Sequence, residues 1–172
     1  MPKEDAWDAL KDLMQNEAET ETDLADNVIP FPIDGSWWEE NPNGTKSLKH
    51  DVLAEYIIKK RLIVRYPDAH GDFYYYNKKS GLYELDKTCR QIRSFIRQEE
   101  EDLKRNQVRE VQEYIEDMCP IKTEISKKYI AVNNGLLRLS DMKFEPFTPN
   151  EFITSKIPTN YNPNAYDDFV AN

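Results

Sequence analysis

The chain has 172 residues, of which 39% are hydrophobic and 32% are charged, and its net charge is −9. This length gives room for one domain of ordinary size and a tail. No run approaches the ~20 apolar residues of a membrane span, and the N-terminus has no apolar secretory stretch, which excludes a membrane partner and favours the cytoplasm of a bacterium or of an infected host cell.

The two cysteines, Cys89 and Cys119, lie in helix-like segments without close partners. We therefore expect reduced, partly buried thiols and no disulfide framework or zinc site. His50 and His70 are too few and too scattered to complete a metal site.

The negative charge is concentrated at the N-terminus. Residues 1–46 contain three lysines and twelve acidic residues, which leaves 23 − 3 = 20 basic and 32 − 12 = 20 acidic residues in 47–172. The globular part is therefore neutral, and the acidic arm either disfavours nonspecific DNA binding or is a solvated tail.

Residues 1–46 are predicted to form an arm that consists of an acidic helix and a linker. A short amphipathic helix is expected over residues 3–18, with its apolar face made by Trp7, Leu10, Leu13 and Met14. Pro30 and Pro32 favour extended backbone after a charged linker. The Trp37–Trp38 pair that follows could stack on bases or pin the linker onto its own domain.

A main domain is predicted over residues 47–157. Ser47 is a plausible N-cap for a helix that ends near Arg61. Three short β-rich runs, separated by turns, then indicate an antiparallel meander, at 62–66, 72–77 and 81–85. Two helices are expected next, over about 87–104 and 107–118, with Pro120 after the second.

The chain returns to strands after these helices. Asn133-Asn134-Gly135 suits a tight hairpin turn between the runs 129–132 and 136–139. Further extended runs are expected at 142–147 and 152–157. The order of elements, without regular βα alternation, predicts an α+β fold of short antiparallel strands with three to four helices and an acidic extended N-terminal arm.

No catalytic constellation is visible. The sequence has five glycines and no G-x-x-x-x-G-K-[ST] loop. The consecutive carboxylates of 99–102 point in different directions on a helix, so they are interpreted as a solvated surface and cannot hold two metal ions by themselves. No nucleophile arrangement is present either. We therefore expect a noncatalytic fragment without a catalytic residue, metal or cofactor of its own.

A candidate DNA-binding surface is carried by arginines. Arg90, Arg93 and Arg97 form one stripe on the helix after Lys87, opposite its apolar face. Guanidinium groups in register could follow a phosphate backbone. The alternative is an ordinary solvated face in which Arg97 pairs with Glu101.

Two other groups of residues are weaker candidates for nucleic-acid contact. Lys59, Lys60 and Arg61 form a second basic cluster. Of the three consecutive tyrosines 74–76, the middle one must face opposite to its neighbours on a strand. One face is therefore expected in the core, and the sequence does not decide whether a base could stack on the other.

Several motifs resemble the domain that precedes the superfamily 3 ATPase in phage and plasmid primase-helicases of the poxvirus type. HDVLAEYIIKKRLIVRY and FYYYNKKSGLYEL look like its opening helix and aromatic strands, and AVNNGLLRL and KIPTNYNPNA are similar to its later part. The residues that match these later motifs are Asn134, Gly135, Leu136, Leu137, Pro158, Tyr161, Pro163 and Ala165. The resemblance spans roughly 48–170 and leaves residues 1–46 outside.

The resemblance implies a collar or adaptor domain that helps a hexameric ring to assemble or guides DNA into it. It implies replication of a virus or mobile element, with residues 158–172 as a linker and the start of a following ATPase domain. ATP and Mg²⁺ are then expected for the parent protein only, which would be an ATP-dependent DNA helicase with or without primase activity.

Two functional hypotheses remain open from the sequence. The first is a noncatalytic accessory domain that contacts single-stranded or forked DNA and self-associates through the parent ATPase. The second is a protein-interaction or oligomerisation module that binds itself or other replication proteins without touching DNA.

Overall fold

The computed structural model describes residues 35–67 and 72–165. The chain divides into two units, Met1–Gly35 and Ser36–Asn172. The helix predicted at 3–18, the linker around Pro30 and the start of a following domain after Ala165 lie outside the described residues.

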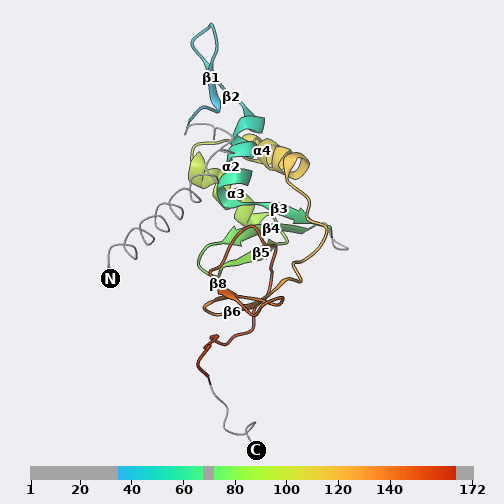
Figure 1. Cartoon of the computed structure of the whole chain (residues 1–172). Helices are drawn as coiled ribbons and strands as arrows, with labels where there is room; N and C mark the ends of the chain where they lie inside the picture. The colour runs from blue at the N-terminus through green and yellow to red at the C-terminus, as the bar shows by residue number, and fades with distance from the viewer. Residues whose placement is uncertain (1–34, 68–71, 166–172) are drawn as a thin grey trace, which may run out of the picture. The chain divides into compact units, whose positions relative to one another are not determined.

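The described residues contain three helices and eight strands. The strands form three separate antiparallel sheets, ordered β1–β2, β3–β4–β5 and β6–β7–β8. This arrangement confirms the predicted α+β class. Within the compact unit, the sheet β3–β4–β5 lies between the helices and the sheet β6–β7–β8 (Figure 1).

A hairpin of β1 (Trp38–Glu40) and β2 (Lys46–Leu48) begins the compact unit. The arm was predicted over residues 1–46, so this hairpin spans the predicted boundary between the arm and the main domain. Trp37 belongs to the main core and is only 2% exposed. Its ring lies 4.9 Å from that of Tyr56, so the tryptophan pins this segment onto its own domain.

Three helices enclose the main core: α2 (His50–Arg61), α3 (Arg90–Glu99) and α4 (Arg105–Met118). Each turns an apolar face inward, and the fully buried side chains include Leu53, Ile57, Ile92, Ile96, Val111 and Ile115. Burial of one such side chain stabilises the folded state by about 1.5–3 kcal/mol relative to leaving it exposed to water. The helices therefore depend on one another for their stability.

The predicted boundaries of α2 and α3 are wrong. The N-cap of α2 is Lys49, and Ser47 instead pairs with Glu39 in the first hairpin. The helix predicted over 87–104 is shorter at both ends, because α3 spans Arg90–Glu99 and is followed by extended backbone at Glu100.

The middle sheet contains β3 (Val64–Tyr66), β4 (Asp72–Asn77) and β5 (Leu82–Asp86). Tyr75 packs edge-to-face on Phe95 of α3, at 5.3 Å between ring centroids. Tyr74 packs instead against Phe152, at 5.3 Å. The expected alternation of the tyrosines is thus confirmed, and an aromatic ring from elsewhere in the chain contacts each face of β4.

The last sheet contains β6 (Tyr129–Val132), β7 (Gly135–Arg138) and β8 (Phe144–Glu145). Asn133 and Asn134 form the predicted turn between β6 and β7. The run predicted as a strand at 152–157 has only an isolated bridge, from Val132 to Ile157. The chain nevertheless follows β6 here, because the Ile157 N–H donates to the carbonyl of Ala131 at 2.9 Å.

Candidate nucleic-acid interface

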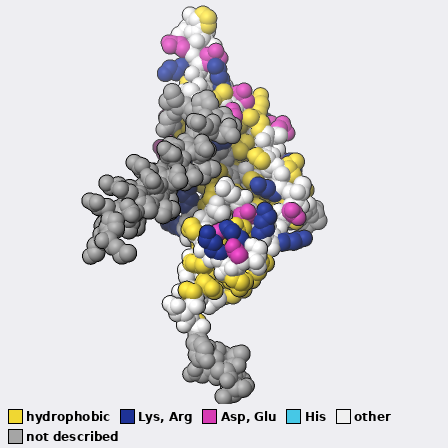
Figure 2. Space-filling model, viewed as in Figure 1, with side chains coloured by type: hydrophobic (Ala, Val, Ile, Leu, Met, Phe, Trp, Pro, Cys, Tyr) yellow, Lys and Arg dark blue, Asp and Glu magenta, His cyan; other side chains and the backbone are white. Residues whose placement is uncertain are grey.

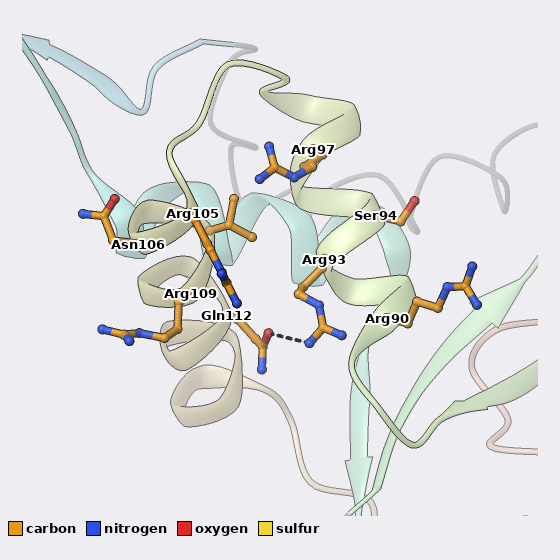
Figure 3. A pocket seen from close by; sticks show the side chains of 9 residues that line it. Arg90, Arg93, Ser94, Arg97, Arg105, Asn106, Arg109 and Gln112 are labelled. Atoms are coloured by element: carbon orange, nitrogen blue, oxygen red, sulfur yellow. Dashed lines mark hydrogen bonds between the residues drawn. The ribbon is translucent and has the colours of Figure 1, made fainter.

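A large hollow lies between α3 and α4. Its volume is about 1130 Å³, and five of the residues that line it are arginines: Arg90, Arg93, Arg97, Arg105 and Arg109. We call this hollow the arginine groove. Figure 3 shows Arg93, Arg97 and Arg105 extending into the space between the helices, and Arg90 and Arg109 extending outward on its two sides.

Helical periodicity explains why the arginines gather there. On α3, Ile92, Phe95 and Ile96 are buried, so residues 90, 93 and 97 fall on the opposite, exposed face. On α4, the buried residues Val108, Val111 and Ile115 place Arg105 and Arg109 on the flank toward α3. Two amphipathic helices that share one core thus bring together two rows of cations.

Most of these charges have no acid beside them. Among residues 35–67 and 72–165, no carboxylate oxygen lies within 4.0 Å of Arg90, Arg93, Arg97 or Arg105. Arg109 pairs with Glu113 at 3.5 Å, but both side chains are exposed, and such pairs contribute little. The groove is therefore strongly positive.

Two arginines of the groove also make structural contacts. Nη1 of Arg93 donates to Oε1 of Gln112 at 3.3 Å and so bridges α3 and α4 (Figure 3). Nη1 of Arg97 donates to the main-chain carbonyls of Glu101 and Leu103. The alternative interpretation paired Arg97 with the Glu101 carboxylate, and in the structure Arg97 binds the main-chain carbonyl of Glu101 instead.

The second basic cluster lies elsewhere and is internally neutralised. Lys59 pairs with Glu55 at 2.6 Å. Lys60 and Arg61 both pair with Glu99, at 2.7 Å and 3.2 Å, and the Glu99 side chain is only 7% exposed. The hydrogen bond to Glu99 raises the pKa of Lys60 above its usual value. The structure therefore brings together Arg90, Arg93 and Arg97 but does not join Lys59, Lys60 and Arg61 to them.

Arg105 and Arg109 are members of the groove that were not predicted from the sequence. Their spacing of four residues was a usable signal, but the second helix was expected to begin at Gln107. In the structure α4 begins at Arg105, because the side chain of Gln107 accepts the N–H of Lys104 at 2.9 Å.

Other kinds of site are not found in the part of the chain that the structure describes. No group of three or more His, Cys, Asp or Glu side chains there could hold a metal ion. None of the described helices is long and apolar enough to cross a membrane. Cys89 and Cys119 are free thiols, and burial raises the pKa of Cys119 to about 12.

The faces seen in Figure 2 carry Lys and Arg interspersed with Asp and Glu, in agreement with the neutral charge balance of the domain. The arginine groove differs from that general surface because its lining residues include no acidic side chain. We therefore regard it as the candidate site for an anionic polymer.

A family model described as D5 N terminal like matches residues 29–170. No curated protein matches the chain. The match spans most of the sequence and agrees with the resemblance carried by the Asn-Gly-Leu-Leu and Pro/Tyr motifs. The chain belongs to the family described as D5 N terminal like, the N-terminal domain of D5-like primase-helicase proteins.

Proposed function

We propose that this domain is a noncatalytic accessory domain, a collar or adaptor, of a D5-like primase-helicase. In this proposal it contacts single-stranded or forked DNA through the arginine groove and guides the DNA toward the ATPase of the parent protein. The observation that carries the proposal is the gathering of five arginines from two helices, four of them without a carboxylate partner among the described residues.

The chemistry of the groove favours phosphate over base recognition. Guanidinium groups bind phosphate oxygens with two parallel hydrogen bonds, and they remain charged at all physiological pH values. The groove lining contains no aromatic ring on which a base could stack. Binding there is therefore expected to depend on salt and not on the base sequence.

The remaining parts of the proposal concern the parent protein. A following superfamily 3 ATPase would bind ATP and Mg²⁺ and drive assembly of a hexameric ring, in the replication of a phage or mobile element in the cytoplasm. Other replication proteins would bind to the same assembly. The family membership supports this setting, and no residue of the described domain is assigned to ATP or Mg²⁺.

The test is binding of fluorescent single-stranded and forked DNA to the 172-residue chain at increasing salt. For about three phosphate contacts on a single strand, log affinity should fall with log salt at a slope near −2, about an 18-fold loss between about 50 and 200 mM.

The sharpest variant replaces Arg90, Arg93 and Arg105 by alanine and keeps Arg97, which holds the loop between α3 and α4. A matched control removes three exposed lysines away from the groove, Lys46, Lys127 and Lys143. Loss of binding in the arginine variant and retention in the control would support the proposal. Equal binding by both variants, or no binding by the wild type at about 50 mM salt, would refute DNA contact at this site.

A second candidate function is a protein-interaction module without DNA contact. Apolar side chains are exposed near the C-terminal end of α4 and just after it. They are Tyr114, Met118 and Ile121. Analytical ultracentrifugation of the wild type and of Met118→Glu with Ile121→Glu would test this function. Self-association that the two glutamates abolish would assign these residues to assembly, and a monomeric wild type would refute this function.

A further inference from the structure

A second hollow lies on the other flank of α3. Its volume is about 560 Å³, within the range of about 300–1,000 Å³ that holds small ligands. The end of α2, the end of β4 with the turn after it, and α3 all contribute to its lining. We call it the tyrosine hollow, and the residues used below are Tyr75, Lys78, Lys79, Gln91 and Phe95.

The tyrosine hollow offers groups that the arginine groove lacks. The ring of Tyr75 stands nearly perpendicular to that of Phe95, at an interplanar angle of 78°. The guanidinium of Arg61 lies 4.7 Å from the centroid of the Phe95 ring and covers it. Tyrosine rings and guanidinium planes are the surfaces on which unstacked bases pack.

Polar groups at the same hollow are available to a ligand. The side chains of Lys78 and Lys79 are exposed, and neither forms an ion pair within the described ranges. The side-chain amide of Gln91 makes no hydrogen bond to another described residue, and it can both donate to and accept from the edge of a base. In contrast, Glu84 is occupied by hydrogen bonds from Tyr75, Asn77 and Ser80.

The two hollows share α3. Arg90, Arg93 and Arg97 line the arginine groove, whereas Gln91, Phe95 and Gln98 line the tyrosine hollow. Since successive helical residues turn by about 100°, these two sets lie on adjacent flanks of one helix, about 10 Å in diameter. One strand of nucleic acid crossing α3 can therefore reach both hollows.

From this juxtaposition we propose that the tyrosine hollow binds an unstacked base of the same single strand whose phosphates lie in the arginine groove. The base packs on Tyr75 and the Arg61 guanidinium, Gln91 bonds its edge, and Lys78 and Lys79 contact the adjoining phosphates. This inference rests on the proposed function, because it uses the strand that the groove holds.

The test compares binding of the 172-residue chain to oligothymidylate and to an abasic strand of the same length. The wild type is expected to bind oligothymidylate at least about fivefold more tightly than the abasic strand. Replacement of Lys78, Lys79 and Gln91 by alanine should lower this ratio, because the edge of the base loses its hydrogen bonds to Gln91. The ratio is the readout, because loss of the two lysines lowers both affinities.

A control variant replaces two lysines and one amide elsewhere on the exposed surface: Lys46, Lys143 and Asn150. It should keep the wild-type ratio. The base site would be refuted by a ratio near one in the wild type. It would also be refuted by a wild-type ratio in the variant that lacks Lys78, Lys79 and Gln91. Neither result would contradict phosphate binding in the arginine groove. Absence of binding to either strand would overturn the groove as well.

Discussion

Nε1 of Trp37 donates a hydrogen bond of 2.6 Å to Oε1 of Glu100, a residue 63 positions further along the chain. Nε1 of Trp38 donates to the same oxygen at 2.9 Å. One carboxylate, at the residue that directly follows α3, thus holds both indoles. Since Trp37 is almost fully buried, it is closed to a base, and the pair fixes the start of the compact unit onto the end of α3.

Removal of this carboxylate should destabilise the domain. In Glu100→Ala the buried N–H of Trp37 loses its acceptor, which is expected to cost about 1–3 kcal/mol of unfolding free energy. Glu100→Gln keeps an acceptor oxygen and should cost less. Urea unfolding followed by tryptophan fluorescence measures both, with the exposed Glu101→Ala as control. A Glu100→Ala midpoint equal to that of Glu101→Ala would contradict the role of the bonds.

Two glycines with similar backbone angles provide a matched pair for a second prediction. Gly44 has φ +76° and open space around it, whereas Gly81 has φ +72° and a Cβ there would overlap the ring of Phe147. Gly44→Ala should cost only backbone strain, about 1–2 kcal/mol. Gly81→Ala should cost about 1–3 kcal/mol more, because Phe147 must move. Thermal unfolding of both variants checks the order, and equal melting temperatures would disprove the steric argument.

The sequence predicted those elements whose signals are local. The strand at 72–77 was predicted from a β-rich run between two turns, and β4 has these bounds. The Asn133-Asn134-Gly135 turn was likewise predictable, since its geometry depends on the residues in the turn itself. The stripe of Arg90, Arg93 and Arg97 followed from helical periodicity alone.

Boundaries that depend on distant contacts could not be predicted in this way. The helix expected to continue to Lys104 ends at Glu99, and the next residue, Glu100, is held by the two indoles. The start of α3 at Arg90 is stabilised by Asp86, because the buried carboxylate of Asp86 accepts a hydrogen bond from the N–H of Ile92 at 2.9 Å. The predicted solvated surface at 99–102 is wrong for Glu99, which is buried between Lys60 and Arg61.

Stability should fall at alkaline pH through Tyr83. Burial raises the pKa of Tyr83 to about 12, and its hydroxyl donates to the carbonyl of Pro149 at 2.7 Å. Because the pKa is higher in the folded state, the contribution is complete below about pH 10, the unfolded value, and is lost as the pH rises through about 12.

The variant Tyr83→Phe tests this pH dependence. At neutral pH it should be less stable than the wild type by about 0.5–1.5 kcal/mol, the value of the lost hydrogen bond. Its disadvantage should shrink as the pH rises above about 10, because phenylalanine does not ionise. Urea midpoints from neutral to alkaline pH measure the difference, and a constant gap between the two proteins would show that Tyr83 does not titrate in this range.

The motif residues Asn134 and Tyr161 are joined by two hydrogen bonds, which gives a last prediction. Nδ2 of Asn134 donates to the carbonyl of Tyr161 at 3.0 Å, and the N–H of Tyr161 donates to Oδ1 of Asn134 at 2.9 Å. The turn after β6 thereby holds the segment that leaves the last sheet. In Asn134→Ala both bonds are lost, and the amide of Tyr161 should exchange hydrogen about five- to tenfold faster or more, as the loss of about 1 kcal/mol or more implies.

Asn134→Asp separates the two bonds, because the carboxylate still accepts from the Tyr161 N–H but cannot donate to its carbonyl. Its exchange rate should lie between those of the wild type and Asn134→Ala. The stacked ring contact between Phe144 and Tyr161, at 5.2 Å, persists in both variants and limits the opening to the local segment. Unchanged exchange at Tyr161 in Asn134→Ala would mean that ring packing alone, and not the asparagine, holds this segment against the sheet.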